Sequence, residues 1–222
     1  MKIALFGGTF DPIHSGHLSA AMAAQSAFAL DEIRFVPTGV PPHKRARTVT
    51  AFADRYAMVA LACNDVPHLA PSRLEDPEHH GGKPNYSIDT IRRFHQQLTD
   101  DDHLYFLIGV DAFLDIPTWR DPVALLDSCD FIVVSRPGFD IGKIRSILPA
   151  ELRSEKPSQE NRIDLRRTSV HLLTTVEADI SSSNIRQRSA HGESLTGLVP
   201  QPVADNIKKR NIYAQETYAE KN

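Results

Sequence analysis

Residues 1–22 read MKIALFGGTFDPIHSGHLSAAM and decide how the rest of the chain is interpreted. A short apolar run, Ile3–Phe6, ends at Gly7 and Gly8, and two histidines, His14 and His17, follow three residues apart. An apolar run that ends in glycines and leads into a helix is typical of the first strand of a parallel sheet. Ligands of such sheets bind beyond the carboxyl ends of the strands, so this stretch predicts a binding site.

The rest of the chain alternates short apolar runs with segments of helical pattern. We expect strands at Lys2–Phe6, Glu32–Pro37, His68–Ser72, Leu104–Gly109, Phe131–Ser135 and Val170–Thr174. We expect helices at Gly16–Phe28, Ala51–Asn64, Ile88–Leu98, Pro122–Ser128, Ile141–Leu148 and Pro200–Ile212, with Thr50 and Ser87 as N-caps. The alternation predicts an α/β fold with a doubly wound, mostly parallel sheet. The polar region at about residues 152–168 is expected to be a surface excursion.

Bulk composition bounds the possible functions. The 222 residues carry a net charge near -3, which argues against a broad nucleic-acid or membrane footprint. Two cysteines, Cys63 and Cys129, do not form a CxxC motif, and neither a signal-peptide core nor a long apolar segment is present. We therefore expect a cytoplasmic protein, with residues 1–213 as a single domain and residues 214–222 as a flexible tail.

Gly7 and Gly8 allow the backbone to approach a phosphate, and the helix that follows offers unpaired N–H groups. The stretch is neither a P-loop nor a GxGxxG fingerprint. Instead His14 and His17, three residues apart at a helix start, can face the same anion, and Gly16 leaves room for a bulky ligand. Two alternatives stay open for these histidines: a helix-capping role and metal ligation. A catalytic zinc site would need a third protein ligand, for which His79 and His80 are the candidates of a suitable residue type.

Further segments contain residue types that suit a nucleotide site. The proline-rich PPHK segment follows the second expected strand and ends in Lys44, a cation that suits a phosphate. Tyr86 and Ser87 stand at the start of an expected helix, where their backbone N–H groups could hold a carboxylate. Gly109 permits close approach of a ligand, Asp111 can accept hydrogen bonds from sugar hydroxyls, and Trp119, the only tryptophan, can stack on a pyridine ring. Asp11 either organises its loop or reaches a metal-bound water. The segment ADISSSNIR joins three serines, Ser181, Ser182 and Ser183, to Arg186 in a candidate polyanion clamp.

Taken together, GGTFDPIHSGH, VPTGVPPHK, KPNYSIDTI, FLIGVDAF with the later TW, and ISSSNIR resemble the signatures of the nucleotidyltransferase superfamily with the (T/H)xGH motif. The chain is most similar to its nicotinate-mononucleotide adenylyltransferases. Ser87 and Ser183 stand where the family often has threonine, and both changes keep the hydroxyl.

The resemblance implies a Rossmann-like, HIGH-type nucleotidyltransferase fold and adenylyl transfer from ATP to nicotinate mononucleotide in NAD biosynthesis. It implies catalytic roles for His14, His17, Lys44 and Arg186. It implies ATP contacts at Gly7, Gly8, Thr9, Phe10, Gly16, His43, Gly109, Asp111, Ile180, Ser181, Ser182 and Ser183, and mononucleotide contacts at Tyr86, Ser87, Trp119 and Lys44. Magnesium is expected to arrive on the ATP phosphates rather than in a protein metal site.

The nucleophile of that reaction is already an anionic phosphate, so no general base is required, and positioning and electrostatics should supply the catalysis. The expected partners are ATP and nicotinate mononucleotide, with no nucleic acid and no membrane, in a monomer or homodimer. Rival interpretations are a related adenylyl- or cytidylyltransferase with another phosphorylated acceptor, a class I aminoacyl-tRNA synthetase fragment, and a non-catalytic nucleotide-sensing module.

Overall fold

The structure is a computed structural model that describes residues 1–40, 49–79, 81–135, 137–154, 159–174 and 180–214. Predictions on His43, Lys44, His80 and the tail 215–222 therefore lie outside the described residues. The strands are β1 Lys2–Gly8, β2 Glu32–Pro37, β3 Leu69–Pro71, β4 His103–Gly109, β5 Asp130–Ser135, β6 Arg162–Asp164 and β7 Ser169–Thr174.

The strands of the described residues form one sheet in the order β3-β2-β1-β4-β5-β7-β6. All neighbours pair in parallel except β6 and β7, which are antiparallel. In register, Phe6 of β1 lies between Phe35 of β2 and Leu107 of β4. Chain order reverses at β1, between β2 and β4, and this reversal marks the topological switch point of the sheet. The predicted α/β, mostly parallel fold is confirmed.

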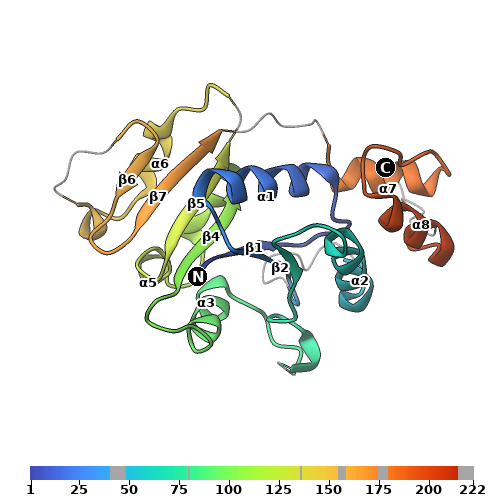
Figure 1. The fold of residues 1–222 in the computed structure, drawn as a ribbon, viewed down its shortest axis with the longest axis horizontal. Helices are drawn as coiled ribbons and strands as arrows, with labels where there is room; N and C mark the ends of the chain where they lie inside the picture. The colour runs from blue at the N-terminus through green and yellow to red at the C-terminus, as the bar shows by residue number, and fades with distance from the viewer. Residues whose placement is uncertain (41–48, 80, 136, 155–158, 175–179, 215–222) are drawn as a thin grey trace, which may run out of the picture.

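Helices cover both faces of the sheet (Figure 1). The α-helices are α1 Ser15–Phe28, α2 Phe52–Cys63, α3 Ser87–His95, α4 Val110–Leu114, α5 Pro122–Leu126, α6 Ile141–Ile147, α7 Ser182–Ala190 and α8 Gln201–Arg210, and short 3-10 turns are η1 Pro77–His79, η2 Ile116–Thr118 and η3 Ala150–Leu152. Helices α1, α2, α7 and α8 pack into one apolar core, and α3, α4, α5 and α6 pack into another.

The two cores follow directly from side-chain alternation along the buried strands. Ala4 and Phe6 of β1 belong to the core under α1 and α2, whereas Ile3 and Leu5 belong to the core under α3. Successive side chains of a strand point to opposite faces, and both faces are apolar here because both are covered by helices. This explains why the strands appear in the sequence as continuous apolar runs.

Some local predictions are wrong. Ala51, not Thr50, is the N-cap of α2, because the Thr50 N–H donates to Asp11 Oδ2 at 3.3 Å in the preceding loop. Tyr86, not Ser87, is the N-cap of α3. The polar region 152–168 is not only an excursion, since it contributes the edge strand β6, whose Ile163 is buried. An edge strand needs one buried residue rather than an apolar run, which is why its signal is weak.

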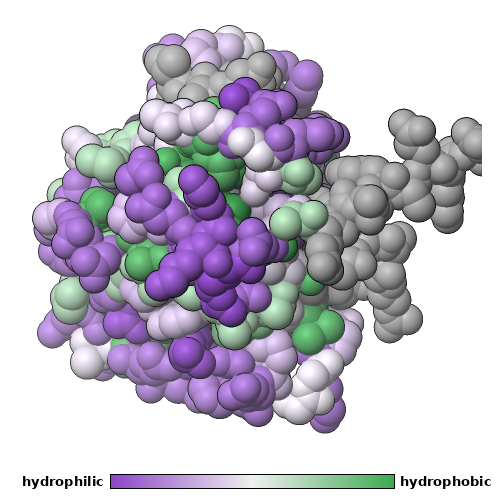
Figure 2. Space-filling view, turned by 90° about the vertical axis from the view of Figure 1, so that its right-hand side faces the viewer, coloured by the Kyte–Doolittle hydropathy of each residue, from purple (hydrophilic) through white to green (hydrophobic). Residues whose placement is uncertain are grey.

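The face that carries α7 and α8 is mainly hydrophilic (Figure 2). Figure 2 shows the side that carries α7 and α8, where hydrophilic side chains dominate and hydrophobic ones are scattered between them. Met1 and Met22 are the large hydrophobic residues exposed within the described ranges. Among the same residues, no helix combines the length and the apolar character needed to cross a bilayer.

Candidate active site

The predicted glycines lie at the switch point of the sheet. Gly7 and Gly8 end β1, and Gly109 ends β4, so the carboxyl ends of two adjacent strands meet there. A Cβ atom at Gly8 would lie 2.8 Å from the ring of Phe10, and one at Gly7 would lie 3.3 Å from Phe106. The absence of side chains at this turn is therefore a packing requirement as well as an opening for a ligand.

The two histidines form a stacked pair at the start of α1. Their ring centroids are 3.6 Å apart with an interplanar angle of 25°. His14 is the N-cap of α1, and Gly16 lies directly beneath its ring, since a Cβ there would be 3.1 Å from His14 Nδ1. The prediction that His14 and His17 share one face is confirmed, and Gly16 makes room for His14 itself. The segment from Asp11 to His17 is called the histidine loop below.

Hydrogen bonding assigns the tautomer of His17. Its Nδ1 accepts the backbone N–H of His14 at 3.2 Å. The proton of a neutral His17 ring therefore lies on Nε2, which becomes the donor available to a ligand. The edge of the ring is fixed by Phe6 and Phe10, whose centroids lie 6.0 and 5.0 Å away. His17 is thus a neutral donor held in a defined orientation.

Burial keeps both imidazoles neutral. It lowers the pKa of His14 to about 4, and it lowers the pKa of His17 well below its usual range, with the neighbouring His14 acting in the same direction. His14 Nδ1 is buried and has no hydrogen-bond partner among the described residues. At neutral pH the pair therefore offers N–H donors rather than two cations.

Helix α7 contacts the histidine loop through Ser182, and the other two predicted serines bond within the α7 segment. The Ser181 hydroxyl caps α7 by accepting the Asn184 N–H at 3.2 Å, and the Ser182 hydroxyl donates to the Pro12 carbonyl at 3.0 Å. Ser183 Oγ accepts from Arg186 Nη2 at 2.9 Å. The ISSSNIR segment and the first motif are thus in direct contact, although about 170 residues separate them in the chain.

Arg186 is buried, with 1% of its surface exposed. Its Nη1 donates to the Asp11 carbonyl, in addition to the bond from Nη2 to Ser183. The guanidinium therefore lies behind the histidine loop and supports its backbone in this conformation. The sequence predicts Arg186 as a contact of the ATP phosphates, but it does not predict that the side chain is buried behind the histidine loop with donors on Asp11 and Ser183.

Three other predicted residues are placed as follows. Phe10 is buried, packs against Phe6 and Phe35, and adopts a positive φ of 48°, so its ring belongs to the core. Ile180 packs against the same core from the start of the α7 segment. Asp111 lies on α4 and is exposed. These positions give Phe10 and Ile180 structural contacts that the motif alone did not reveal.

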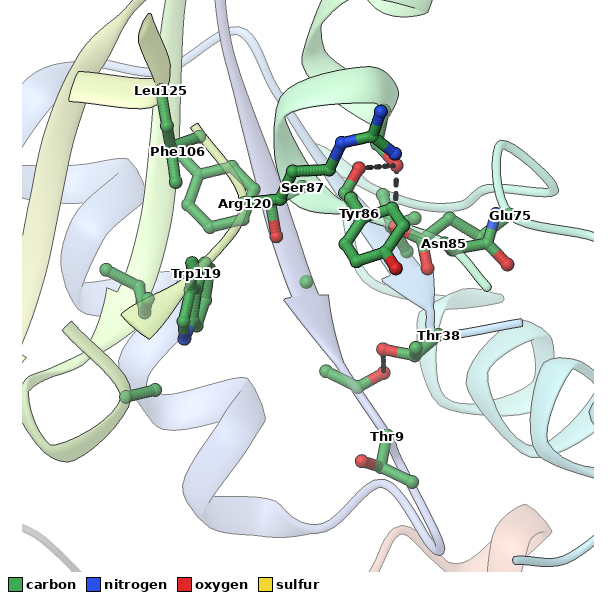
Figure 3. A pocket seen from close by; sticks show the side chains of 16 residues that line it. Thr9, Thr38, Glu75, Asn85, Tyr86, Ser87, Phe106, Trp119, Arg120 and Leu125 are labelled. Atoms are coloured by element: carbon green, nitrogen blue, oxygen red, sulfur yellow. Dashed lines mark hydrogen bonds between the residues drawn. The ribbon is translucent and has the colours of Figure 1, made fainter. Parts of the chain in front are cut away.

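A cavity of about 300 Å³ lies at the end of β1, where Gly7, Gly8 and Thr9 line it just before the chain enters the histidine loop (Figure 3). Its apolar wall comes from β4 and the segment after it, including Phe106, Ile108 and Leu125. Three predicted ATP residues, Gly7, Gly8 and Thr9, line it, together with the predicted mononucleotide residues Tyr86, Ser87 and Trp119. We call it the aromatic cavity. The fold therefore brings two predicted groups of ligand residues to one place.

Trp119 and Tyr86 lie on opposite sides of the aromatic cavity in Figure 3. Trp119 ends the 3-10 turn η2 and is partly buried against the core under α3. Arg120 lies over the Tyr86 ring, 4.8 Å from its centroid, and forms a 3.6 Å ion pair with Asp89. A flat ligand between these walls would contact an indole, while the start of α3 supplies N–H groups from Tyr86 and Ser87.

Asp11 is 4% exposed and is held by two partners. Tyr213 donates its hydroxyl to Asp11 Oδ1 at 2.9 Å, and the Thr50 N–H donates to Oδ2. Of the two predicted roles, these contacts support the organisation of the loop.

Sequence reasoning missed several residues around the site. Arg55, on α2, is 1% exposed and donates to the backbone carbonyls of Thr9, Thr38 and Thr50. Glu75 is buried in the cavity wall, where Oε1 accepts from Thr90 Oγ1 at 2.7 Å. One feature of the sequence could have identified Arg55 as a buried functional residue. It is a charged residue on the otherwise apolar face of α2, between Phe52 and Met58.

The described residues contain no group of three or more His, Cys, Asp or Glu side chains arranged to hold a metal ion. The alternative in which His14 and His17 ligate zinc therefore has no third ligand of those types in the part of the chain that is described.

Comparisons with known proteins agree on the fold and the family. A sequence model of the cytidylyltransferase-like family matches residues 5–188. A protein of Solibacter usitatus named "Probable nicotinate-nucleotide adenylyltransferase" is 43% identical over 92% of this chain and 95% of its own, and one with the same name from Geotalea uraniireducens is 39% identical over 96% and 98%. The solved structure of Plasmodium falciparum nicotinic acid mononucleotide adenylyltransferase complexed with APC covers 96% of this chain and 97% of its own, with a TM-score of 0.70 at 20% identity.

Proposed function

The chain belongs to the cytidylyltransferase-like family and, within it, to the nicotinate-nucleotide adenylyltransferases, and we propose the following mechanism on that premise. The enzyme transfers the adenylyl group of ATP to nicotinate mononucleotide, and the products are nicotinate adenine dinucleotide and pyrophosphate. One observation carries the site assignment: Gly7, Gly8 and Thr9 line a cavity that has an indole on one side and a helix N-terminus on the other, and the chain runs from them directly into the loop of the stacked histidines.

The reaction joins two anions. A phosphate oxygen of the mononucleotide attacks the α-phosphorus of ATP, the bond from that phosphorus to the bridging oxygen breaks, and the electron pair leaves with pyrophosphate. No proton has to be removed from the nucleophile. The protein has to align the two phosphates and stabilise the negative charge that builds on the α-phosphate oxygens.

We assign that charge stabilisation to the histidine pair. His17 presents Nε2–H, because its Nδ1 is occupied by the His14 N–H. For His14 the mechanism takes the same tautomer, so that a second Nε2–H can face the phosphate. Two neutral donors can approach the same phosphate without the mutual repulsion that two imidazolium ions 3.6 Å apart would suffer.

The mononucleotide fits the aromatic cavity. Its pyridine ring would stack on Trp119, and its carboxylate would meet the N–H groups of Tyr86 and Ser87 at the start of α3. A helix N-terminus favours a negative group, and this preference distinguishes nicotinate from the neutral nicotinamide. Lys44, which lies outside the described residues, stays a predicted phosphate contact on both substrates.

Magnesium enters as part of the ATP substrate in this proposal. Mg²⁺ usually keeps several waters and is bound largely by substrate phosphates, where it neutralises part of their charge. The single domain over residues 1–213, the monomer or homodimer, and the cytoplasmic location stay predictions.

The test is pyrophosphate release from ATP with purified enzyme and either nicotinate or nicotinamide mononucleotide, with the dinucleotide product identified by mass. We expect kcat/KM for the nicotinate form to be at least ~10-fold higher, the scale of one charge-assisted contact. Faster turnover of another phosphorylated acceptor would reassign the substrate. Nucleotide binding without pyrophosphate release under any condition would favour a sensing module.

A further inference from the structure

Arg55 lies outside every motif considered above, yet it is one of the two most completely buried large charged residues in the described chain. It projects from α2 and uses all three guanidinium nitrogens. Nε donates to the Thr50 carbonyl at 2.8 Å, Nη1 to Thr9 at 2.7 Å, and Nη2 to Thr38 at 2.7 Å and to Gly39 at 3.5 Å. A buried charge whose three nitrogens all donate to backbone carbonyls is a structural clamp.

The clamped carbonyls belong to the site. Thr9 and Thr38 both line the aromatic cavity, and Thr38 donates its N–H and its hydroxyl to the Gly8 carbonyl at 2.8 and 3.2 Å. Thr50 donates its N–H to Asp11 Oδ2 in the histidine loop. One side chain therefore joins the turn after β1 to the segment after β2 and to the residue that leads into α2.

The charge environment of Arg55 is consistent with this role. Burial lowers the pKa of the guanidinium, and the nearby Asp11 and Glu75 carboxyls and the Tyr213 hydroxyl act in the opposite direction. Arginine remains protonated under such conditions, and its planar fork presents fixed donors to several carbonyls at once. A lysine would keep the charge but could not reach three separate segments from one nitrogen atom.

We propose that Arg55 is a positioning residue for adenylyl transfer: it fixes Thr9, Thr38 and Thr50 together, and so holds the cavity-lining turn after β1 against the end of β2 and the start of α2. Thr38 and Gly39 precede residues 41–48 in the sequence, and Thr50 follows them. Arg55 touches no substrate in this account and acts through the backbone that it holds. The catalytic part of the inference rests on the proposed function, whereas the anchoring part does not.

The experiment compares wild type, Arg55→Met and Arg55→Lys in the full chain, with Leu148→Ala as the control. Leu148 is buried in the core under α3, so its truncation should lower the melting temperature without touching the clamp. Each variant is measured for melting temperature, for kcat and both KM values, and for the rate of trypsin cleavage after Lys44, Arg45 and Arg47 under native conditions.

For Arg55→Met we expect kcat to fall at least ~10-fold with smaller changes in both KM values, because misplaced groups cost turnover more than binding. We expect cleavage within residues 44–47 to accelerate by about 10-fold as the flanks are released. Arg55→Lys should recover only part of each loss. Leu148→Ala should melt at a lower temperature while it keeps wild-type kcat and cleavage at these three sites.

The proposal would be overturned if Arg55→Met kept both the wild-type kcat and the wild-type cleavage rate. It would also be overturned if Leu148→Ala, at a melting temperature similar to that of Arg55→Met, showed the same loss of kcat and the same faster cleavage. If Arg55→Met does not fold, the same measurements on Arg55→Lys decide the matter. The cleavage assay needs no substrate, so it tests the anchoring even if the wild-type enzyme failed to use nicotinate mononucleotide. Failure of the proposed function and failure of the clamp are therefore separate results.

Discussion

The histidine loop and the aromatic cavity are connected through the turn after β1, but their side chains make different kinds of contact. Around the histidine loop, polar side chains bond mainly to the protein itself: Ser182 to Pro12, Arg186 to Asp11, and His17 to His14. Around the cavity, the walls facing the ligand are largely aromatic and aliphatic, with Trp119 and Phe106 among them. In one region the polar groups are already held by hydrogen bonds, whereas the other leaves an open, largely apolar space.

This difference has a physical basis. Charge develops on phosphate oxygens during the reaction, and donors that are already oriented need no reorganisation at that moment. A pyridine ring keeps its shape throughout, so burial and stacking can hold it without an elaborate network. The two regions should therefore respond differently to substitution, and the following experiments separate them.

The largest effect is expected from His17→Ala. Loss of an oriented donor to the transition state should reduce kcat by at least ~100-fold, with smaller changes in the KM values, because the interaction strengthens as charge develops. Steady-state kinetics with both substrates measure this split. Near-normal turnover in a folded variant would remove His17 from the proposed mechanism and would make the histidine loop a structural element.

The second effect concerns pH and the histidine pair. His14 has its pKa lowered to about 4 by burial, whereas an unfolded histidine titrates near 6.5. Between these values the unfolded chain binds more protons than the folded one, so stability falls as pH decreases through this window. From pH 7 to pH 5, His14 alone should account for a loss of about 2 kcal/mol in the free energy of unfolding.

Urea unfolding at pH 7 and pH 5 tests this expectation in wild type and in His14→Asn. The difference between the two pH values should shrink by roughly 2 kcal/mol in the variant. A core control, Leu148→Ala, should instead lose a similar amount of stability at both pH values. An unchanged difference in His14→Asn would mean that His14 is not held neutral by burial.

The smallest effect belongs to the aromatic cavity. Trp119→Ala should raise KM for nicotinate mononucleotide by about 10-fold and KM for ATP much less, since stacking and burial of one ring contribute on the order of 1–2 kcal/mol. Trp119→Phe keeps a flat ring and serves as the matched variant, with an intermediate KM. Equal changes in both KM values would contradict stacking on the pyridine ring.

The sequence predicted the sheet well because both faces are buried, and continuous apolar runs such as Phe131–Ser135 identify strands of that kind. It also predicted the histidine pair, because neighbouring positions on a helix start follow from spacing alone. It did not predict the enclosure of Arg186 or the reach of Arg55. Both side chains donate to backbone carbonyls of distant segments. Every residue has a backbone carbonyl, so the residue types in those segments do not indicate which carbonyl will accept from an arginine.

The helix caps show the same limit on a smaller scale. Thr50 and Ser87 have the side chains that caps prefer, but Thr50 uses its backbone to hold Asp11, and the chain enters α3 one residue earlier, at Tyr86. Propensity describes what a residue can do locally. Tertiary contacts with Asp11 decided what Thr50 does in this fold.

The bond from Tyr213 to Asp11 joins positions 202 residues apart and has a consequence for the order of folding. The first βαβ unit is built from neighbouring segments and can form early, but Asp11 gains its phenolic partner only when the segment after α8 has packed against it. The histidine loop therefore acquires all its contacts only after a long-range closure of the chain.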